Sequence, residues 1–560
     1  MPSLTRDEFI DHVRAHRAEA GERTLAVPVS LRLLSDQLTP VLAYRRLVAP
    51  DERTAPSFLL ESVENQPGSG RSAVGQGRYS SLGARPAVEV VASGDRVTVT
   101  DHRGGPGPLD QPVEGRIEPR TDPFEAMRRF NAGLVTAVPE ASVHRGMLPD
   151  CATAGWVGYA GYDTVRDAEP EKLDPARAPA DDRGLPDLAF GLYRSVVVFD
   201  HARRLVYLVR TALVNPVDDP GAAWDAAVES LRGLGAQIQT HTRAMPSGEV
   251  PPADTAPALD ASDSNMTRAQ YDAMLDRALE YIRAGDIFQV VLGQRFERRS
   301  PADPFDVYRA LRSINPSPYM AYIQTPGCIL VASSPEILCR VERDDAGDLV
   351  VTNRPLAGTR PRGRTTDEDA ALGRDLLADP KERAEHTMLV DLGRNDVGVV
   401  ARPGSVRLPD VMTVERYSHV MHISSTVTGV LRAGLDCWDA LRAALPVGTI
   451  SGAPKIRAMQ IIDELEPVRR GPYGGGLGWV GLDGQMDIAL ALRTIVVPTA
   501  ARAPGVGWAY HIQAAGGIVA DSKHEDEYRE TVNKAAAMAR AIGLAERVFT
   551  EGEPTDPSEV

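Results

Sequence analysis

The chain has 560 residues, of which 43% are hydrophobic and 25% charged, and its formal net charge at pH 7 is -15. This composition is typical of a globular protein with a sizeable core, and the length predicts two domains or one large interlocked fold. The acidic excess and the 5% share of aromatic residues argue against nucleic acid or an anionic membrane as a partner. No apolar run approaches the ~20 residues of a membrane span.

The amino-terminal segment carries charged side chains throughout and has no apolar stretch of signal-peptide length. The chain has four cysteines, none of which forms a CxxC pair, so neither a disulfide framework nor a structural zinc site is expected. These features predict a protein of the reducing cytoplasm.

The first half of the chain contains both strand-like and helix-like patterns. Apolar runs at 87–91 and 195–199 predict strands, and the spacing at 220–234 predicts a helix. From about residue 235 to 265 the sequence becomes rich in Pro, Ala, Thr, Ser and Asp, which is typical of a linker. We therefore expect an N-terminal domain over residues 1–250, ending in this linker, and a second domain over residues 266–546.

The second half begins with a predicted helix and strand. Thr267 and Gln270 form a capping-box pattern ahead of one apolar helical face, and the pattern ends at Gly285. A strand-like run follows at 287–296. Helices and strands then continue in mixed order with long antiparallel-looking stretches, which favours an α+β fold over regular βαβ winding.

Two pairs of glutamates lie on predicted helices of the second half, Glu382 with Glu385 and Glu527 with Glu530. Each spacing places both carboxylates on one helical face, and two facing helices can supply the oxygen ligands that Mg²⁺ prefers. Taken alone, such a pair is more often a solvated helix face. Lys534 follows Glu530 by one turn and can pair with a substrate carboxylate or form a plain helix salt bridge.

The glycine-rich segment 471–481 formally satisfies the GxGxxG pattern of dinucleotide-binding proteins. It leads through a tight turn into the β-like stretch 486–497 instead of opening a helix, so we reject that interpretation. Its glycines are predicted to allow close approach of the backbone to a ligand. The small-residue turns at 451–455 and 514–517 can hold carboxylates through backbone N–H groups.

The motifs of the second half occur in an order that resembles one enzyme family. They are FQVVLGQRF (288–296), NPSPYMAY (315–322), SSPEIL (333–338), RPLAGTRPRG (354–363), ERAEHTMLVDLGRND (382–396), SHVMHI (418–423), PVGTISGAPK (446–455), PYGGGLGW (472–479), ALRT (491–494), GGIVADS (516–522) and EYRETVNKA (527–535). Together they resemble the chorismate-utilising enzymes and, among these, the large subunits of anthranilate synthase. LLES (59–62) and GRYSSLG (77–83) resemble the N-terminal domain of the same subunits.

The resemblance implies an α+β fold of large antiparallel β-sheets flanked by helices, with an N-terminal regulatory domain packed on the catalytic domain. It also implies a Mg²⁺ ion that holds the ring carboxylate of chorismate, with Glu385 and Glu530 as direct ligands and Glu382 and Glu527 completing the acidic region. The substrate-binding residues that it implies are Thr449, Tyr473, Arg493, Ala514, Gly516, Gly517 and Lys534.

Two catalytic roles follow from the same resemblance. Glu336 corresponds to the general acid, which is needed because the C4 hydroxyl leaves poorly unless a proton reaches it as its bond breaks. His422 corresponds to the histidine of the second half of the reaction, in which pyruvate leaves and the ring becomes aromatic. Whether His422 removes the C2 proton or orients the intermediate stays open, and His419 is the weaker candidate for this role.

Two positions distinguish the branches of the family. Gln289, the third residue predicted for the catalytic site, stands where members that add water have a lysine base, and glutamine is no base near neutral pH. Ala357 stands where aminodeoxychorismate synthases carry a nucleophilic lysine. We therefore expect ammonia to attack C2 directly, giving aminodeoxyisochorismate and then anthranilate. The segment 515–517 reads Ala-Gly-Gly where the family usually has Gly-Ala-Gly, which changes where a positive φ is allowed.

The resemblance also implies partners and regulation. No glutaminase segment is recognisable, so ammonia is expected from glutamine through a separate glutamine amidotransferase subunit, in a heterotetramer of two large and two small subunits. L-tryptophan is the expected inhibitor, and the residues implied for its site are Glu61, Ser62, Asn315, Pro318, Tyr319 and Met320. The alternatives are an aminodeoxyisochorismate synthase that stops before pyruvate loss and a non-catalytic regulator that binds tryptophan or chorismate.

Overall fold

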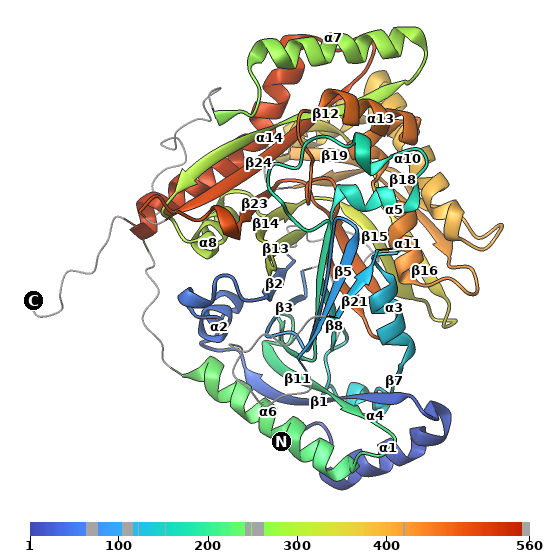
Figure 1. The fold of residues 1–560 in the computed structure, drawn as a ribbon, viewed down its shortest axis with the longest axis vertical. Helices are drawn as coiled ribbons and strands as arrows, with labels where there is room; N and C mark the ends of the chain where they lie inside the picture. The colour runs from blue at the N-terminus through green and yellow to red at the C-terminus, as the bar shows by residue number, and fades with distance from the viewer. Residues whose placement is uncertain are drawn as a thin grey trace, which may run out of the picture.

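The computed structural model describes residues 1–62, 77–102, 116–120, 122–151, 153–240, 248, 263–417, 420–503 and 505–550. Long antiparallel ladders dominate these residues, and helices lie on the outer faces of the sheets, so the predicted α+β class is confirmed (Figure 1). No helix within these ranges is both long and apolar enough to cross a membrane.

The first of two large sheets joins strands from both halves of the chain. Its spatial order is β20 (Gly452–Ala453), β12 (Gln289–Ser300), β24 (Trp508–Ile518), β23 (Thr494–Pro498), β14 (Cys328–Ser334), β13 (Tyr319–Thr325), β2 (Ser57–Glu61), β3 (Tyr79–Ala84), β10 (Ser195–Asp200), β11 (Leu205–Val214), β1 (Thr24–Leu34) and β7 (Leu134–Thr136). The two halves meet where β13 pairs with β2, with Met320 opposite Glu61.

The second sheet is also continuous across the two halves. Its order is β17 (Leu356–Pro361), β19 (Val420–Val430), β16 (Leu349–Asn353), β15 (Ile337–Arg343), β22 (Met486–Leu490), β21 (Gly476–Gly481), β8 (Gly155–Ala160), β9 (Leu188–Tyr193), β4 (Val88–Ser93), β5 (Arg96–Asp101) and β6 (Arg116–Pro119), and β18 (Arg407–Arg416) pairs with β19 beside this path. Here the junction is the β8–β21 pair.

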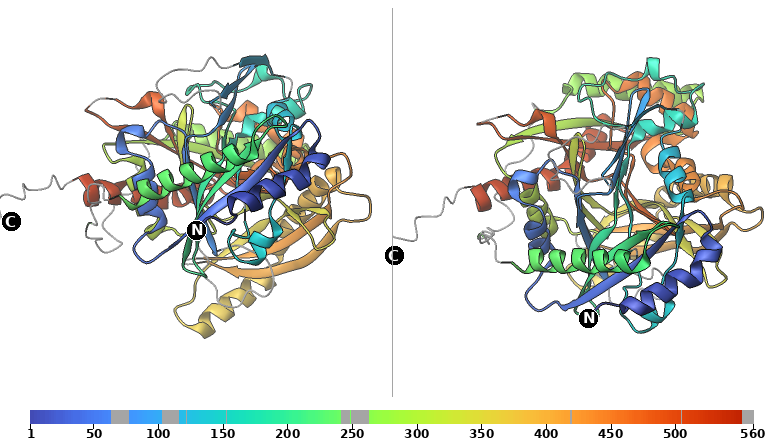
Figure 2. Two further views of the ribbon diagram at one scale, coloured as in Figure 1. Left: turned by 90° about the horizontal axis from the view of Figure 1, so that it is seen from below. Right: turned by 60° about the horizontal axis from the view of Figure 1, so that its bottom comes forward.

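The α-helices cover the outer faces of both sheets. They are α1 (Arg6–Ala20), α2 (Pro40–Leu47), α3 (Glu125–Ala132), α4 (Glu140–His144), α5 (Val165–Ala168), α6 (Pro220–Gln239), α7 (Arg268–Ala284), α8 (Pro304–Ile314), α9 (Thr366–Ala378), α10 (Pro380–Val400), α11 (Cys437–Ala444), α12 (Gly448–Ser451), α13 (Lys455–Leu465) and α14 (His524–Ala545). Helices α1 and α6 lie side by side across one end of the molecule, and α7 lies at the other (Figures 1 and 2).

The buried apolar residues show that the two sheets face each other. Phe58 and Val496 of the first sheet share one core cluster with Tyr159 and Leu477 of the second. A larger cluster packs the other face of the first sheet against α1, α2, α6, α8 and α14, and another packs the second sheet against α3, α10 and α11. Two sheets between two helical layers therefore form the body of the protein.

Most of the predicted helices and strands are confirmed, although some of them begin or end at different residues. Thr267 caps α7 through a complete capping box with Gln270, and Gly285 ends the helix with φ 81°. The helix predicted at 220–234 continues to Gln239. Most of the predicted linker lies outside the described residues, and the domain boundary stays a prediction. Strands from both sides of it share both sheets.

The glycine-rich segment corrects one prediction. A Cβ on Gly478 would lie 2.2 Å from the carbonyl oxygen of Asp487, and a Cβ on Gly475 would lie 2.2 Å from that of Ala160. Neighbouring strands therefore occupy the space beside these two glycines, and the predicted approach of a ligand there is wrong. The segment forms β21 and turns into β22, as expected when the dinucleotide interpretation was rejected.

A buried ion pair ties together segments that line the functional cavity described below. The Arg470 side chain is 2% exposed and contacts Glu466, which is 3% exposed, at 2.6 Å. Arg470 also donates to the carbonyls of Ile450 and Val291 at 2.7 and 2.8 Å. Glu466 in turn accepts a hydrogen bond from the backbone N–H of Gly293 at 3.0 Å. The pair thus fixes α12 and β12 relative to α13.

We predict that Arg470→Met lowers the free energy of unfolding by about 3–5 kcal/mol, because it leaves the buried Glu466 carboxylate without its cation. Chemical denaturation measures the change. Arg277→Met is the control, since the Arg277–Glu280 pair is 48% and 58% exposed and such exposed pairs contribute little to stability. Equal losses in the two variants would contradict the proposed importance of burial.

Candidate active site

A cavity of about 740 Å³ opens where β12 and β24 meet α10, α12 and α14. All three predicted catalytic residues line it, and so do all four predicted acidic residues. The predicted residues among its lining are Gln289, Glu336, Glu382, Glu385, His422, Thr449, Tyr473, Arg493, Ala514, Gly517, Glu527, Glu530 and Lys534. Gly516 does not line the cavity but packs beside it, since a Cβ there would lie 3.1 Å from Oε2 of Glu527.

Glu336 is a buried carboxyl group that keeps its proton at neutral pH. It follows the end of β14 and is 4% exposed. Burial raises its pKa to about 8, against hydrogen bonds from the Thr449 hydroxyl and the Leu356 backbone that favour the charged form. The Thr449 Oγ1 donates to Oε1 at 3.1 Å. A carboxyl group in this state can donate a proton within the cavity.

His422 is held in one tautomer. It lies on β19, and its Nδ1 is 2.8 Å from the carbonyl oxygen of Gly358. Because a carbonyl only accepts, Nδ1 carries the hydrogen, and Nε2 is left as an acceptor. Burial lowers the pKa of His422 to about 4, so the imidazole is neutral at physiological pH. The predicted alternative, His419, lies outside the described residues.

Arg493 supplies a buried positive charge. Burial lowers the pKa of its guanidinium, and among the described residues no carboxylate pairs with it. Its backbone adopts φ 45°, which is unusual for a residue other than glycine. Two further groups border the cavity here: Tyr473, which is 3% exposed, and Lys534, whose Nζ donates to the Ala515 carbonyl at 2.8 Å. These groups can bind an anion bidentately and exclude water from it.

The predicted acidic region faces the cavity from two helices. Asp379 caps α10, with Pro380 at its first position, and this places Glu382 and Glu385 on the cavity side. Burial raises the pKa of Glu385, and the charges of Glu382 and of Glu530 on α14 raise it further. The carboxylates of the two helices therefore repel one another across the cleft.

The donor set fits Mg²⁺, although its side chains have other partners in this arrangement. Glu382 contacts Arg360 at 3.1 Å, Glu527 accepts from Ser522 at 2.7 Å, and Glu530 contacts Lys534 at 2.6 Å. No group of three or more potential metal ligands is gathered within the described ranges. Oxygen ligands from carboxylates are nevertheless the chemistry that Mg²⁺ takes, and a cation there would offset the repulsion.

The Ala-Gly-Gly segment on β24 is constrained by space. Neither Gly516 nor Gly517 has a positive φ, so the expected effect of the sequence change on backbone conformation is wrong. A Cβ on Gly517 would instead lie 2.5 Å from Nε2 of Gln289. Gln289 Nε2 also donates to Oε1 of Glu385 at 3.5 Å, a long contact. The small residue at 517 thus makes room for Gln289 beside the acidic region.

The residues predicted for the inhibitor site are divided between two places. Glu61 and Met320 are opposite each other on β2 and β13, and the hydroxyl of Ser62 accepts from the Gly77 N–H at 2.9 Å. Asn315 instead lines the catalytic cavity. Tyr319 donates to Asp487 at 3.2 Å, and Pro318, between them in sequence, is half-buried.

Glu61 already has partners. It is 7% exposed, and it accepts from the Tyr308 hydroxyl at 2.6 Å. Arg312 Nε lies 2.7 Å from Oε2, the oxygen that also accepts from Tyr308, and Arg312 Nη2 donates to Oε1 at 3.0 Å. A ligand ammonium at Glu61 would therefore have to share the carboxylate with Arg312.

The cavity also contains residues that sequence analysis missed. Lys381 lines it beside Glu385, and the i, i+4 spacing of the two residues was a usable signal. Gly358, whose carbonyl orients His422, lies within a quoted motif, but only the structure shows its role. Gln513 lines the cavity from β24, and no spacing in the sequence connects it to the other site residues.

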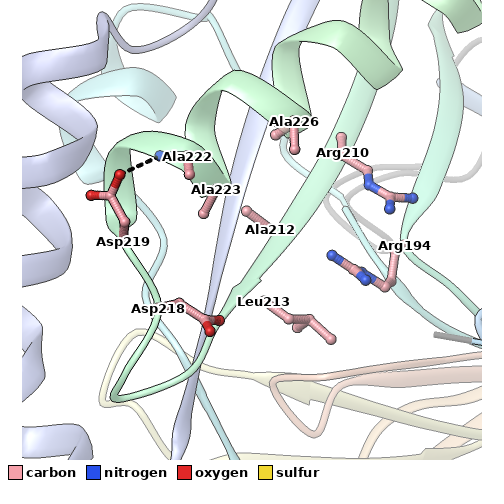
Figure 3. Close-up of a pocket in the computed structure, with 10 residues that line it drawn as sticks. Arg194, Arg210, Ala212, Leu213, Asp218, Asp219, Ala222, Ala223 and Ala226 are labelled. Carbon is pink, nitrogen blue, oxygen red and sulfur yellow. Dashed lines mark hydrogen bonds between the residues drawn. The ribbon is translucent and has the colours of Figure 1, made fainter. Parts of the chain in front are cut away.

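A second hollow, of about 310 Å³, lies between α6 and β11. The side chains of Arg194 and Arg210 lie near each other on one side of this hollow, while Asp219 caps α6 by accepting from the Ala222 N–H (Figure 3). Arg210 donates to the Ser195 hydroxyl at 2.8 Å. No residue predicted for a site lines this hollow.

Comparisons with known proteins agree with the geometry. Residues 76–540 match the family model described as chorismate binding enzyme. The chain is 50% identical over 546 residues to anthranilate synthase alpha subunit 1, chloroplastic, of Oryza sativa subsp. indica, covering 96% of this chain and 91% of that protein. It is 43% identical over 541 residues to anthranilate synthase component 1 of Streptomyces coelicolor, covering 96% and 93%.

A solved structure shows the same similarity in three dimensions. The chain superposes on anthranilate synthase component I from Streptococcus pneumoniae TIGR4 with a TM-score of 0.67 and 31% identity, covering 91% of this chain and 99% of that one. The prediction of a cytoplasmic location is contradicted, because the plant relatives are named as chloroplastic proteins. Its basis was the scarcity of cysteine pairs, which reports a reducing environment and does not identify the compartment.

We predict that Glu336→Gln removes part of the pH dependence of stability. Between the unfolded value of 4.5 and about 8, the folded state holds a proton on Glu336 that the unfolded state has lost. Wild-type stability therefore falls as pH rises through this window, and the glutamine variant lacks this contribution. Denaturation at several pH values measures it, with Glu280→Gln, at an exposed ion pair, as the control. Equal slopes for wild type and Glu336→Gln would contradict a buried neutral carboxyl.

Proposed function

The chain belongs to the family of chorismate-binding enzymes and, within it, to the large subunits of anthranilate synthase, and we propose how its cavity carries out their reaction. That reaction converts chorismate and ammonia to anthranilate and pyruvate, the first step of tryptophan biosynthesis. One observation carries the assignment of roles. A neutral carboxyl group (Glu336), a neutral imidazole (His422) and a guanidinium without a carboxylate partner among the described residues (Arg493) line the same cavity.

Chorismate carries two carboxylates, and the cavity offers a separate place for each. Arg493 binds the carboxylate of the enolpyruvyl side chain, because its planar guanidinium is buried and lacks a carboxylate partner among the residues described. Tyr473 and Gly517 also line the cavity. Lys534 leaves Glu530 for the substrate, since an ion pair that is 44% and 47% exposed is weak in water.

The ring carboxylate belongs at the acidic region. Glu385 and Glu530 would hold Mg²⁺, with Glu382 and Glu527 beside them. When bound, Mg²⁺ supplies the positive charge that lets an anionic substrate approach these glutamates. The support from the structure is that the four carboxylates line one cavity from two helices.

In the first half of the reaction, the nitrogen of ammonia forms a bond to C2, the two conjugated ring double bonds each shift by one position, and the C4–O bond breaks. Glu336 gives its proton to the departing hydroxyl, which leaves as water, and the surplus proton of the new ammonium group restores Glu336. The Thr449 hydroxyl, 3.1 Å from Oε1, orients the acid. Such general acid catalysis is typically worth about 10²–10⁴-fold in rate.

In the second half, aminodeoxyisochorismate loses its C2 proton and its enolpyruvyl group. The C3–O bond breaks, the leaving group takes up a proton to become pyruvate, and the ring becomes aromatic. We assign the acceptor of the C2 proton to Nε2 of His422, because its Nδ1–H is committed to the Gly358 carbonyl. A neutral imidazole is the form that can accept.

Ammonia comes from a partner. The names of the plant relatives call them alpha subunits, and this implies a second subunit, which we take to be a glutamine amidotransferase that releases ammonia from glutamine. We propose the heterotetramer of two large and two small subunits for this chain as well.

We further propose that L-tryptophan inhibits the enzyme by binding where the two halves meet at β2 and β13. This proposal is supported by the pairing of Glu61 with Met320 across the junction and by the position of Ser62 directly after the end of β2. The ligand ammonium would share the Glu61 carboxylate with Arg312, and the buried Met320 side chain offers a soft apolar contact.

The experiment that tests the function follows anthranilate fluorescence near pH ~8 from chorismate, Mg²⁺ and ammonium. We expect product with wild type, loss of activity in EDTA with recovery on adding Mg²⁺, and a ~10²–10⁴-fold lower turnover for Glu336→Gln. Glu280→Gln is the control and should retain activity. A product that keeps the enolpyruvyl group would identify an aminodeoxyisochorismate synthase. Ligand binding without turnover would identify a regulator.

The inhibitor site is tested with Ser62→Leu and Met320→Thr. We expect tryptophan to inhibit wild type and to lose its effect on both variants, while chorismate kinetics without tryptophan stay unchanged. The expected loss corresponds to a coupling of about 1–3 kcal/mol between the two ligands. Steady-state rates over a range of tryptophan concentrations give the answer. Variants inhibited as strongly as wild type would remove the site from the β2–β13 junction.

A further inference from the structure

We propose that Tyr417 is a positioning residue that fixes the imidazole of His422 for the second half of the reaction, and that Glu415 and Arg354 hold it in place. This inference rests on the proposed role of His422. Tyr417 belongs to none of the site predictions made from the sequence, and it follows directly after β18.

The ring of Tyr417 packs on the ring of His422. Their centroids are 5.5 Å apart, and the planes are inclined by 60°. The backbone N–H of Tyr417 donates to the carbonyl of Val420 at 2.8 Å, and its own carbonyl accepts from Arg362. Two backbone contacts therefore hold the residue at the point where β18 leads into β19.

The hydroxyl end of Tyr417 is tethered as well. It donates to Oε2 of Glu415 at 2.7 Å, and Arg354 forms an ion pair with the same carboxylate. Arg354 Nε also donates to the Ser424 hydroxyl at 3.0 Å. A charge-assisted hydrogen bond at one end and packing at the other restrict the rotation of the tyrosine ring.

The strand register places this tether beside His422. Glu415 is the direct partner of His422 across the β18–β19 ladder, so the two side chains share a face of the sheet. The Gly358 carbonyl, on β17, accepts the Nδ1 hydrogen bond of the ring. His422 is thus held at Nδ1 by a hydrogen bond and on its ring by Tyr417, which leaves Nε2 aimed in one direction.

Tyr417 also lies near two further groups of the site. A negative charge on Glu336 would raise the pKa of Tyr417, and a negative charge on Tyr417 would raise the pKa of Arg493. Arg354 offsets the negative charge of Glu415, which would otherwise favour a protonated His422.

The two halves of the reaction depend on different residues. Amination depends on Glu336 and ammonia, whereas pyruvate elimination depends on the placement of His422. A misplacement of a catalytic group by about 1 Å can cost about 10²-fold in rate. Loss of the Tyr417 ring should therefore slow elimination and leave amination nearly unchanged.

The test is a single-turnover experiment with wild type, Tyr417→Leu, Tyr417→Phe and Glu415→Gln, in which chorismate, the aminated intermediate and anthranilate are separated by mass. For Tyr417→Leu we expect elimination ~10²-fold slower, with accumulation of the intermediate and chorismate consumption close to wild type. Tyr417→Phe keeps the ring and should restore most of the elimination rate. Glu415→Gln should slow elimination by a smaller factor, which supplies a second readout if the leucine variant does not fold.

Tyr281→Leu is the matched control, because the Tyr281 hydroxyl also donates to a glutamate, Glu464, at 2.7 Å, whereas its ring packs against Arg277 and Arg457 and not against His422. It should leave both halves unchanged. Equal slowing of amination and elimination in Tyr417→Leu, or no accumulation of the intermediate, would overturn the inference. If His422→Met accumulates the intermediate while Tyr417→Leu does not, the role of His422 stands and that of Tyr417 falls. A wild type that forms no anthranilate would refute the proposed function instead.

Discussion

Removal of charged groups from water is the constraint on which this site depends. The same burial raises the pKa of Glu336, lowers that of His422 and lowers that of Arg493. Burial thus prepares one group to give a proton and another to accept one, at the same pH. Burial also makes an anion at Arg493 favourable, because its guanidinium has no carboxylate partner among the residues described. Ion pairs at these positions would have favoured the charged forms of Glu336 and His422 and removed this chemistry.

The two continuous sheets provide the apolar surroundings in which these groups are buried. Apolar side chains fill the space between them, and the cavity occupies the end where β12 and β24 meet α10 and α14. The arginine that is fully compensated, Arg470, is paired with Glu466 behind the cavity wall. The two buried arginines therefore differ in function: the charge of Arg470 is neutralised by Glu466, whereas the charge of Arg493 is available to an anionic ligand.

The chemical groups of the site were easier to predict from the sequence than their arrangement in space. The capping box at Thr267 and the start signal at Pro380 predicted two helices, because local hydrogen bonds and fixed φ angles determine such ends. The joining of both halves into shared sheets was not predictable, since strand partners far apart in sequence leave no periodic signal. The need for glycine at position 478 was also not predictable, because the atom that would clash with a Cβ there belongs to a neighbouring strand. Site residues inside quoted motifs were found, whereas Gln513 and Tyr417 depend on packing that only the fold creates.

The strand register also connects the proposed inhibitor site with the substrate. Met320, opposite Glu61 on one side, is opposite Ser333 on the other. The backbone N–H of Ser333 donates to the carbonyl of Arg493 at 3.1 Å. Arg493 adopts a strained φ of 45°, and such a conformation persists only while its surroundings impose it. A ligand that moves β13 against β2 would therefore act, through Ser333, on the backbone that presents the guanidinium proposed to bind the substrate. Inhibition by this route needs no contact with the catalytic groups, so a variant at the junction can lose regulation and keep its chemistry.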